Sequence, residues 1–147
     1  MPSTLKLAYP RTVVGSRISA FVDVIPSNLT LTGTATRTVT MFKATQRMIL
    51  RKATWSQELA VDGTKTITVQ NNTTTVNMTT ALTINGLGAL GSANFVLNNA
   101  INGGSDSNMV VKTGDVIVCV YTVTVAGSVA PSECSISLEF ALLGKYN

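Results

Sequence analysis

The stretch KTGDVIVCVYTVTV, residues 112–125, decides the fold class of this chain. Its last ten residues are almost all β-branched or aromatic, a composition that favours a strand buried on both faces or nearly so. A run of this length is too short to cross a membrane as a helix, and valine and threonine are poor helix formers. Gly114 lies in the polar turn before the run and can adopt a positive φ. We therefore expect a long internal strand over 116–125.

The next segment, ECSISLEFAL at 133–142, alternates between apolar and polar side chains. A period of two predicts a strand with one face in the core and the other in water. The expected inner face carries Cys134, Ile136, Leu138, Phe140 and Leu142. Because only a short segment, GSVAP at 127–131, separates the two strands, we predict that they pair as an antiparallel hairpin at the centre of a β-sandwich.

This hairpin also predicts the state of the two cysteines. A turn centred on residues 128–129 would place Cys119 opposite Leu138 and Cys134 opposite Val123. An offset of four positions corresponds to about 13 Å along a strand, too far for a disulfide. Both cysteines are therefore predicted to be free thiols.

The remainder of the chain predicts further short strands separated by turns. Asp62-Gly63 is a strong hairpin signal, and Asn71-Asn72-Thr73 predicts another turn. The mixed patterning of residues 47–59 indicates a bulge near Arg51-Lys52. Other strands are expected at 18–25, 65–70, 76–78, 81–84 and 93–97. Residues 30–40 are expected to form a weak strand or an adaptable loop that leads into 39–42. About nine short strands without a long helix predict an all-β fold, a single antiparallel β-sandwich of the jelly-roll kind.

The chain is expected to form one domain at 18–147, preceded by an extended basic N-terminal arm at 1–17. The arm contains Pro2, Pro10 and Gly15 and has no sustained apolar periodicity. Its removal should therefore take away little of the hydrophobic core. Its start has no basic-then-apolar leader, and we expect synthesis in a cytoplasm and no membrane segment.

Chemistry-bearing side chains are sparse in this sequence. It has no histidine, and its two cysteines lack the spacing of a zinc site. Asp115 follows Gly114, with Asp106 nearby in sequence, but a surface turn explains that pattern better than a cation site does. Trp55 and Tyr121 could form a sugar-binding platform, although core positions are the favoured interpretation. We expect no enzyme, no metal and no cofactor.

Charge is scarce and unevenly distributed. Only 12% of the residues are charged, where soluble surfaces usually carry about 25–35%, so we expect the chain to associate with copies of itself or with a partner. Residues 1–52 contain eight Lys/Arg and one acid, whereas residues 53–147 contain three Lys/Arg and six acids. One interpretation is that these charges are scattered over solvated faces. The other is that the cations form a basic surface that binds an acidic partner.

The candidate partner-binding residues follow from this distribution. The first choice is the cations of the arm, Lys6, Arg11 and Arg17. The second choice is a group on the strand expected at 47–59, which consists of Arg47, Arg51 and Lys52. Nucleic acid is not the expected partner, because single-strand binders pair such cations with exposed aromatic residues, and only 5% of this chain is aromatic.

The order of parts from residue 39 to residue 142 resembles small tailed-phage virion proteins that decorate or cement the capsid. The resemblance lies in VTMFKA, RMILRKATW, KTITVQ, INGLGAL, and then VKTGDVIVCVYTVTV followed by CSISLEFALL. It covers about two-thirds of the chain and leaves out the N-terminal arm.

The resemblance implies a non-enzymatic virion protein on the capsid exterior that binds the major capsid protein of the same virus and reinforces the lattice. A homo-oligomer, favoured as a trimer, is the expected form. Two other functions fit the sequence: a carbohydrate- or receptor-binding module of a phage tail or fibre, and a coat protein that forms the shell itself.

Overall fold

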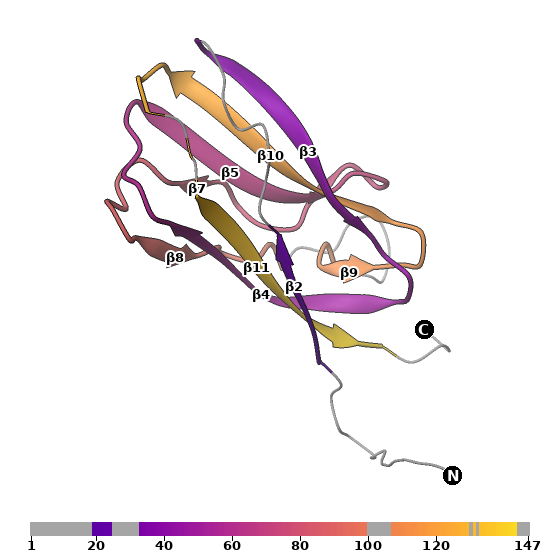
Figure 1. The fold of residues 1–147 in the computed structure, drawn as a ribbon. Coiled ribbons are helices and arrows are strands. Elements are labelled where there is room, and N and C mark those ends of the chain that lie inside the picture. Colours follow the sequence, from indigo (N-terminus) through magenta and orange to yellow (C-terminus); the bar gives the residue numbers. More distant parts are fainter. Residues whose placement is uncertain (1–18, 25–32, 100–106, 130, 132, 144–147) are drawn as a thin grey trace.

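The computed structural model describes residues 19–24, 33–99, 107–129, 131 and 133–143. The described part of the chain contains no helix and forms two antiparallel sheets that pack face to face (Figure 1). The predicted all-β sandwich is therefore confirmed. The predicted arm at 1–17, with Lys6, Arg11 and Arg17, lies outside the described residues.

One sheet has the strand order β3-β10-β5-β6, with β7 also paired to β5. The other has the order β2-β11-β4-β8, with β9 also paired to β4. The strand bounds are β2 (Ser19–Val24), β3 (Ala35–Lys43), β4 (Met48–Gln57), β5 (Thr64–Asn71), β6 (Val76–Asn77), β7 (Leu82–Thr83), β8 (Ser92–Asn94), β9 (Val110–Val111), β10 (Val116–Val125) and β11 (Cys134–Leu142). The short strand β9 was not expected from the sequence.

The strand pairs are nested in sequence. β2 pairs with β11, β3 with β10, β4 with β8 and β9, and β5 with β6 and β7. This is the order obtained when one long antiparallel ribbon is folded over on itself so that successive pairs alternate between two sheets. The connectivity is that of a jelly roll.

The predicted hairpin between 116–125 and 134–142 is wrong. β10 lies between β3 and β5 in one sheet, and β11 lies between β2 and β4 in the other. Each strand is central in its own sheet and therefore has hydrogen-bonding partners on both edges. The connection between them crosses from one sheet to the other, and the alternation that predicted two strands did not specify which sheet each joins.

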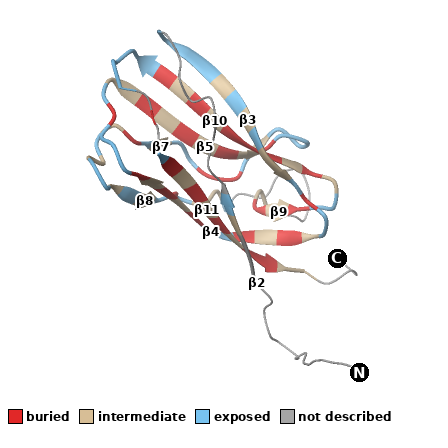
Figure 2. Cartoon of the chain, viewed as in Figure 1, coloured by how far each residue is buried: buried red, intermediate tan, exposed pale blue. Residues whose placement is uncertain are grey.

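The core lies between the two sheets, and buried positions alternate with half-buried ones along β5 and along most of β11 (Figure 2). Ile136, Leu138 and Phe140 are fully buried on the inner face of β11. On β10 the inner face is buried, whereas Val120 and Thr122 on the outer face are half-buried. The expectation of a strand buried on nearly both faces therefore holds for only part of β10.

Both cysteines are free and buried, as predicted, although the register used for that prediction was wrong. Cys119 lies on β10 and Cys134 begins β11, so the two belong to different sheets. Burial raises the pKa of the Cys119 thiol to about 12 and that of Cys134 to about 11. Neither thiol is a thiolate at neutral pH, and neither is a nucleophile.

The predicted hairpin at Asp62-Gly63 is also wrong. β4 and β5, which flank this pair, belong to different sheets, so the segment is a second inter-sheet crossing. Gly63 has a positive φ of 72°, a conformation that glycine adopts readily. A Cβ on Gly63 would meet the Val125 carbonyl oxygen at 2.3 Å. The two crossings, 58–63 and 126–129, are thus in close contact at one end of the sandwich.

Turns at the opposite end agree with the sequence. The Asn71 side-chain oxygen accepts hydrogen bonds from the backbone N–H groups of Thr73 (3.1 Å) and Thr74 (3.4 Å), which turns the chain between β5 and β6. Asn71 also donates to the Asp115 carboxylate at 2.7 Å. The turn expected at Asn71-Asn72-Thr73 is confirmed, and it is attached to the turn that precedes β10.

Candidate functional site

A β-bulge on β4 exposes two adjacent cations. The register between β11 and β4 runs from Glu139 opposite Lys52 to Phe140 opposite Leu50, which leaves Arg51 without a directly opposite residue. Consecutive residues of a regular strand point to opposite faces, so one of these two cations would otherwise enter the core. Leu50 and Ala53 on either side are fully buried, and both cations are exposed. The predicted bulge near Arg51-Lys52 is confirmed.

Three further cations lie at the adjacent end of the sandwich. Lys43 ends β3, and the loop after it is joined to the turn before β10 by two backbone bonds, Ala44 N–H to Asp115 O and Gly114 N–H to Ala44 O, both 2.8 Å. Met48 of β4 lies opposite Val111 of β9. This pairing brings Arg47, which precedes Met48, close to Lys112, which follows Val111. We call the set Lys43, Arg47, Arg51, Lys52 and Lys112 the basic end.

Two acids among the described residues accompany the basic end. Asp115 is buried and accepts hydrogen bonds from Asn71 Nδ2 and from the Lys112 backbone N–H at 2.9 Å. Its carboxylate therefore faces inward. Glu139 lies directly opposite Lys52 across the strands, and these two side chains line a shallow depression with Thr54 and Ser137. Among the described residues, the basic end has five cations and these two acids, and Lys43, Arg51, Lys52 and Lys112 are exposed.

The structure unites the second group of predicted residues and adds to it. Arg51 and Lys52 lie together, and Arg47, half-buried, precedes the same strand. The sequence did not single out Lys43 and Lys112. Lys43 is separated from Arg47 only by the short loop after β3. Lys112 reaches Arg47 through the pairing of β4 with β9, in which Met48 lies opposite Val111.

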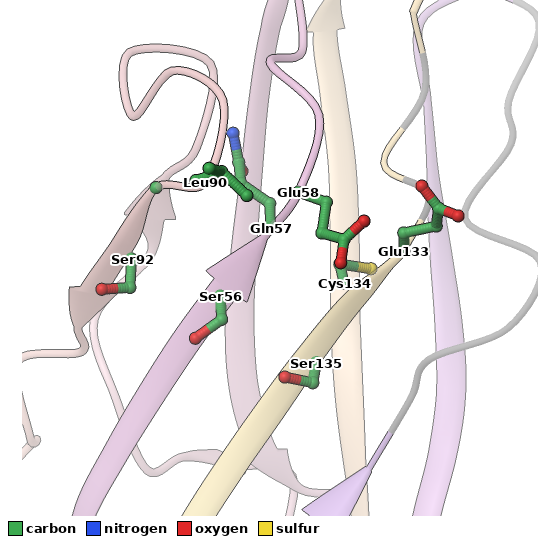
Figure 3. A pocket seen from close by; sticks show the side chains of 9 residues that line it. Ser56, Gln57, Glu58, Leu90, Ser92, Glu133, Cys134 and Ser135 are labelled. Atoms are coloured by element: carbon green, nitrogen blue, oxygen red, sulfur yellow. The ribbon is translucent and has the colours of Figure 1, made fainter.

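The far end of the sandwich is acidic. Glu58, Asp62 and Glu133 lie there, on the segments that follow β4 and precede β11. Figure 3 shows Glu58 and Glu133 on either side of Cys134 in an open pocket of about 530 Å³. The buried amide of Gln57 is already used there, since it accepts from Trp55 Nε1 (2.8 Å) and donates to the Gly88 carbonyl (2.9 Å). Both ends of the Gln57 amide are therefore held by hydrogen bonds within the fold.

Asp62 fastens the two inter-sheet crossings together. Its carboxylate accepts hydrogen bonds from the backbone N–H of Val129 (2.8 Å) and from the N–H and hydroxyl of Ser128 (both 2.9 Å). Lys65, whose side chain is buried, lies 3.3 Å from the same carboxylate and also donates to the Asp62 carbonyl. The Val129 N–H, followed by the Ser128 bonds, holds the pKa of Asp62 well below its usual range.

Replacing Asp62 with alanine should lower the melting temperature at pH 7 by several degrees and leave the Lys65 ammonium buried without its carboxylate partner. A carboxyl with a depressed folded-state pKa stabilises the fold above its unfolded value near 4, and that contribution is lost as the pH falls through the folded value. The difference between wild type and Asp62→Ala should therefore shrink as the pH falls from about 5 to about 2.

Thermal unfolding followed by circular dichroism at each pH measures this effect. Asp23→Ala is the control and should resemble wild type throughout. Asp23 is exposed on β2, where it lies opposite Ser137 of β11. A constant difference between wild type and Asp62→Ala over this pH range would contradict the role given to the carboxylate.

The other chemical features considered in the sequence have structural roles. Within the described ranges, no three His, Cys, Asp or Glu side chains are grouped so that they could hold a metal ion. Trp55 and Tyr121 are both 0% exposed, so the favoured core interpretation is confirmed and neither ring can serve as a sugar-binding platform.

Comparison with protein-family models, with curated proteins and with solved structures finds no match to this chain. In the part of the chain that the structure describes, no helix is long and apolar enough to cross a membrane. The class that the fold defines is the jelly-roll β-sandwich, here with a basic end and an acidic end.

Proposed function

We propose that this chain is a non-enzymatic virion protein that binds the exterior of an assembled phage capsid and reinforces its lattice. The partner is the major capsid protein of the same virus, and the contact is the basic end together with the arm cations Lys6, Arg11 and Arg17. The working form is a homo-oligomer, for which the sequence favoured a trimer.

The observation that carries this proposal is the bulge at Arg51. In a strand with regular alternation, one outward-facing residue separates Leu50 from the next core position. Here two outward-facing residues separate them, and both are cations. Side by side and outside the core, they add positive charge to a surface that is otherwise poor in charge. Such a concentrated patch suits an acidic protein surface, which it attracts over long range and pairs with on contact.

The fold supports the same proposal by analogy. Jelly rolls occur in viral capsid proteins and in lectins, although a fold alone does not specify a function. Reinforcement needs no catalytic group, because each copy can add modest contacts that are multiplied over a symmetric lattice.

The test uses capsids of the virus that encodes the chain, assembled without it. Added protein should bind saturably at symmetry-related sites, seen by electron microscopy, and should raise the temperature at which the capsids release DNA. Binding should weaken as the salt concentration rises from low to about 0.5 M, because ions screen the exposed cations. A protein that leaves capsids unbound at low salt would contradict the proposal.

A shell-forming coat protein is the second candidate, and the jelly-roll connectivity favours it because viral shells are built from this fold. Expression of the chain alone separates the two. A coat protein should assemble into closed particles without any other component, whereas a decoration protein should remain as small species. The alternative of a carbohydrate-binding module loses its main support, since Trp55 is in the core.

A further inference from the structure

Exposed apolar side chains gather at the acidic end of the sandwich. The large apolar side chains that are exposed among the described residues are Leu59, Leu90, Val96, Val125 and Val129. All but Val96 belong to the segments that meet at this end, which are the two inter-sheet crossings, the end of β10 and the loop before β8. Leu90 is 82% exposed and has a positive φ of 55°, which is uncommon for a leucine. Apolar groups gathered in this way mark an interaction surface, whereas scattered ones do not.

Hydrogen bonds hold these segments side by side. The Glu58 N–H donates to the Glu133 carbonyl at 3.1 Å, and the Leu90 N–H donates to the Glu58 carbonyl at 2.9 Å. The Val129 N–H donates to the Asp62 carboxylate at 2.8 Å. Glu58, Leu90 and Glu133 also line one open pocket (Figure 3). We call this surface the end patch, and it consists of Leu59, Leu90, Val125 and Val129 with Glu58 and Glu133.

The two carboxylates of the end patch have no partner among the described residues. Glu58 and Glu133 are exposed, and no hydrogen bond or ion pair joins either side chain to another described residue. The Asp62 carboxylate is different, because Ser128 and Lys65 already hold it. A partner that fits the end patch therefore carries cations for two unpaired carboxylates and apolar side chains for the exposed leucines and valines.

The N-terminal arm of this chain has that chemistry. Residues 5–11 read LKLAYPR, so that Lys6 and Arg11 are interspersed with two leucines and a tyrosine. Residues 1–17 together contain three cations and no acid. The basic end is a poorer match, because it is cationic but none of the exposed large apolar side chains of the described residues belongs to it.

The arm is attached at the opposite end of the molecule from the end patch. β2 begins at Ser19, which lies opposite Ala141 near the last residues of β11. The end patch lies beside Cys134, where β11 begins. An arm of 17 residues spans up to about 60 Å when extended, so it is long enough to reach the end patch of a second copy placed head to tail.

We propose that the end patch is a docking site for the N-terminal arm of a second copy of this chain. The arm's leucines and tyrosine cover the exposed apolar side chains, and Lys6 and Arg11 pair with Glu58 and Glu133. The contact is heterologous, so successive copies close into a ring or continue as an open chain, and the trimer expected from the sequence is one such ring. The inference goes beyond the proposed function and is tested without a capsid. An arm docked on a neighbour is not free for a capsid, so the two contacts compete for it.

Sedimentation velocity of the purified full chain, from about 1 µM to about 1 mM, measures the association. Two full-length variants each reverse the charge on one side of the contact: Lys6→Glu with Arg11→Glu in the arm, and Glu58→Lys with Glu133→Lys in the end patch. Each should raise the dissociation constant at least about tenfold, because like charges then face each other. An equimolar mixture of the two variants should associate again, since the reversed arm of one meets the reversed patch of the other.

Leu90→Ser tests the apolar part of the contact without a change of charge, and it should also weaken association. Val96→Ser is the matched control and should leave association unchanged. Val96 is 67% exposed, but β8 has carried the chain away from the end patch before this residue is reached. Circular dichroism should show an intact β fold in every variant.

Three results would overturn the proposal. One is a wild-type chain that stays monomeric over the whole concentration range. Another is a mixture of the two charge-reversed variants that remains as dissociated as each variant alone, because the arm then does not dock on a second copy. The third is an equal weakening by Leu90→Ser and Val96→Ser, which would remove the end patch as the site.

Discussion

Replacing Trp55 with alanine is expected to lower the free energy of unfolding by about 3–5 kcal/mol, the usual cost of removing a large aromatic side chain from a core. The indole is 0% exposed and lies on β4, the strand that pairs with β11 through the middle of its sheet. Its removal also takes away the donor to Gln57, a buried side chain that connects β4 to the loop at Gly88. Urea denaturation followed by circular dichroism measures the loss.

Leu59→Ala is the control for this prediction. Leu59 follows β4, which ends at Gln57, and its side chain is 46% exposed. Its truncation should change the free energy of unfolding by less than about 0.5 kcal/mol. Equal losses in the two variants would mean that Trp55 is not the core residue the structure shows.

Reversing the charge of the bulge is expected to weaken capsid binding by about ten- to a hundredfold, which corresponds to roughly 1.4–2.8 kcal/mol. The change is the double variant Arg51→Glu with Lys52→Glu. Both side chains are exposed on an outer face, so the fold should tolerate the substitution. Acidic side chains there would repel an acidic partner and slow association as well. Binding to capsids assembled without the chain, measured at low salt, gives the affinity.

The matched control reverses two charges at the acidic end, Glu58→Lys with Glu133→Lys. Both glutamates are exposed, and the far end of the sandwich is not part of the proposed contact, so this variant should bind as well as wild type or slightly better through its added positive charge. Equal weakening in the two double variants would place the contact elsewhere on the surface.

Local alternation was enough to predict several features of this protein. The inner face of β11 follows from a period of two, because successive side chains of a strand point to opposite faces wherever the strand is placed. The bulge at Arg51 follows from the same rule, since Leu50 and Ala53 can both be buried only if the alternation is interrupted between them. The turn after β5 follows from the Asn71 side chain, which bonds to its own backbone.

The pairing of strands was decided only by the tertiary structure. β10 and β11 are neighbours in sequence and carry the pattern of a hairpin, yet each is central in a different sheet. Asp62-Gly63 carries a hairpin signal, yet in the structure only Gly63 has a positive φ and the pair lies in an inter-sheet crossing. Which edge a strand joins depends on the packing of side chains far apart in sequence, and no local pattern carries that information.

The candidate site divides in the same way. The chain alone determined that Arg51 and Lys52 would be exposed together and that the first third would be basic. The tertiary structure decided that Lys112 joins them, because Met48 lies opposite Val111 in the pairing of β4 with β9. It also bonded the loop after Lys43 to the turn before β10. It also decided which side chains of β3, β10 and β5 share a face, because a face exists only once strands distant in sequence lie side by side in a defined register.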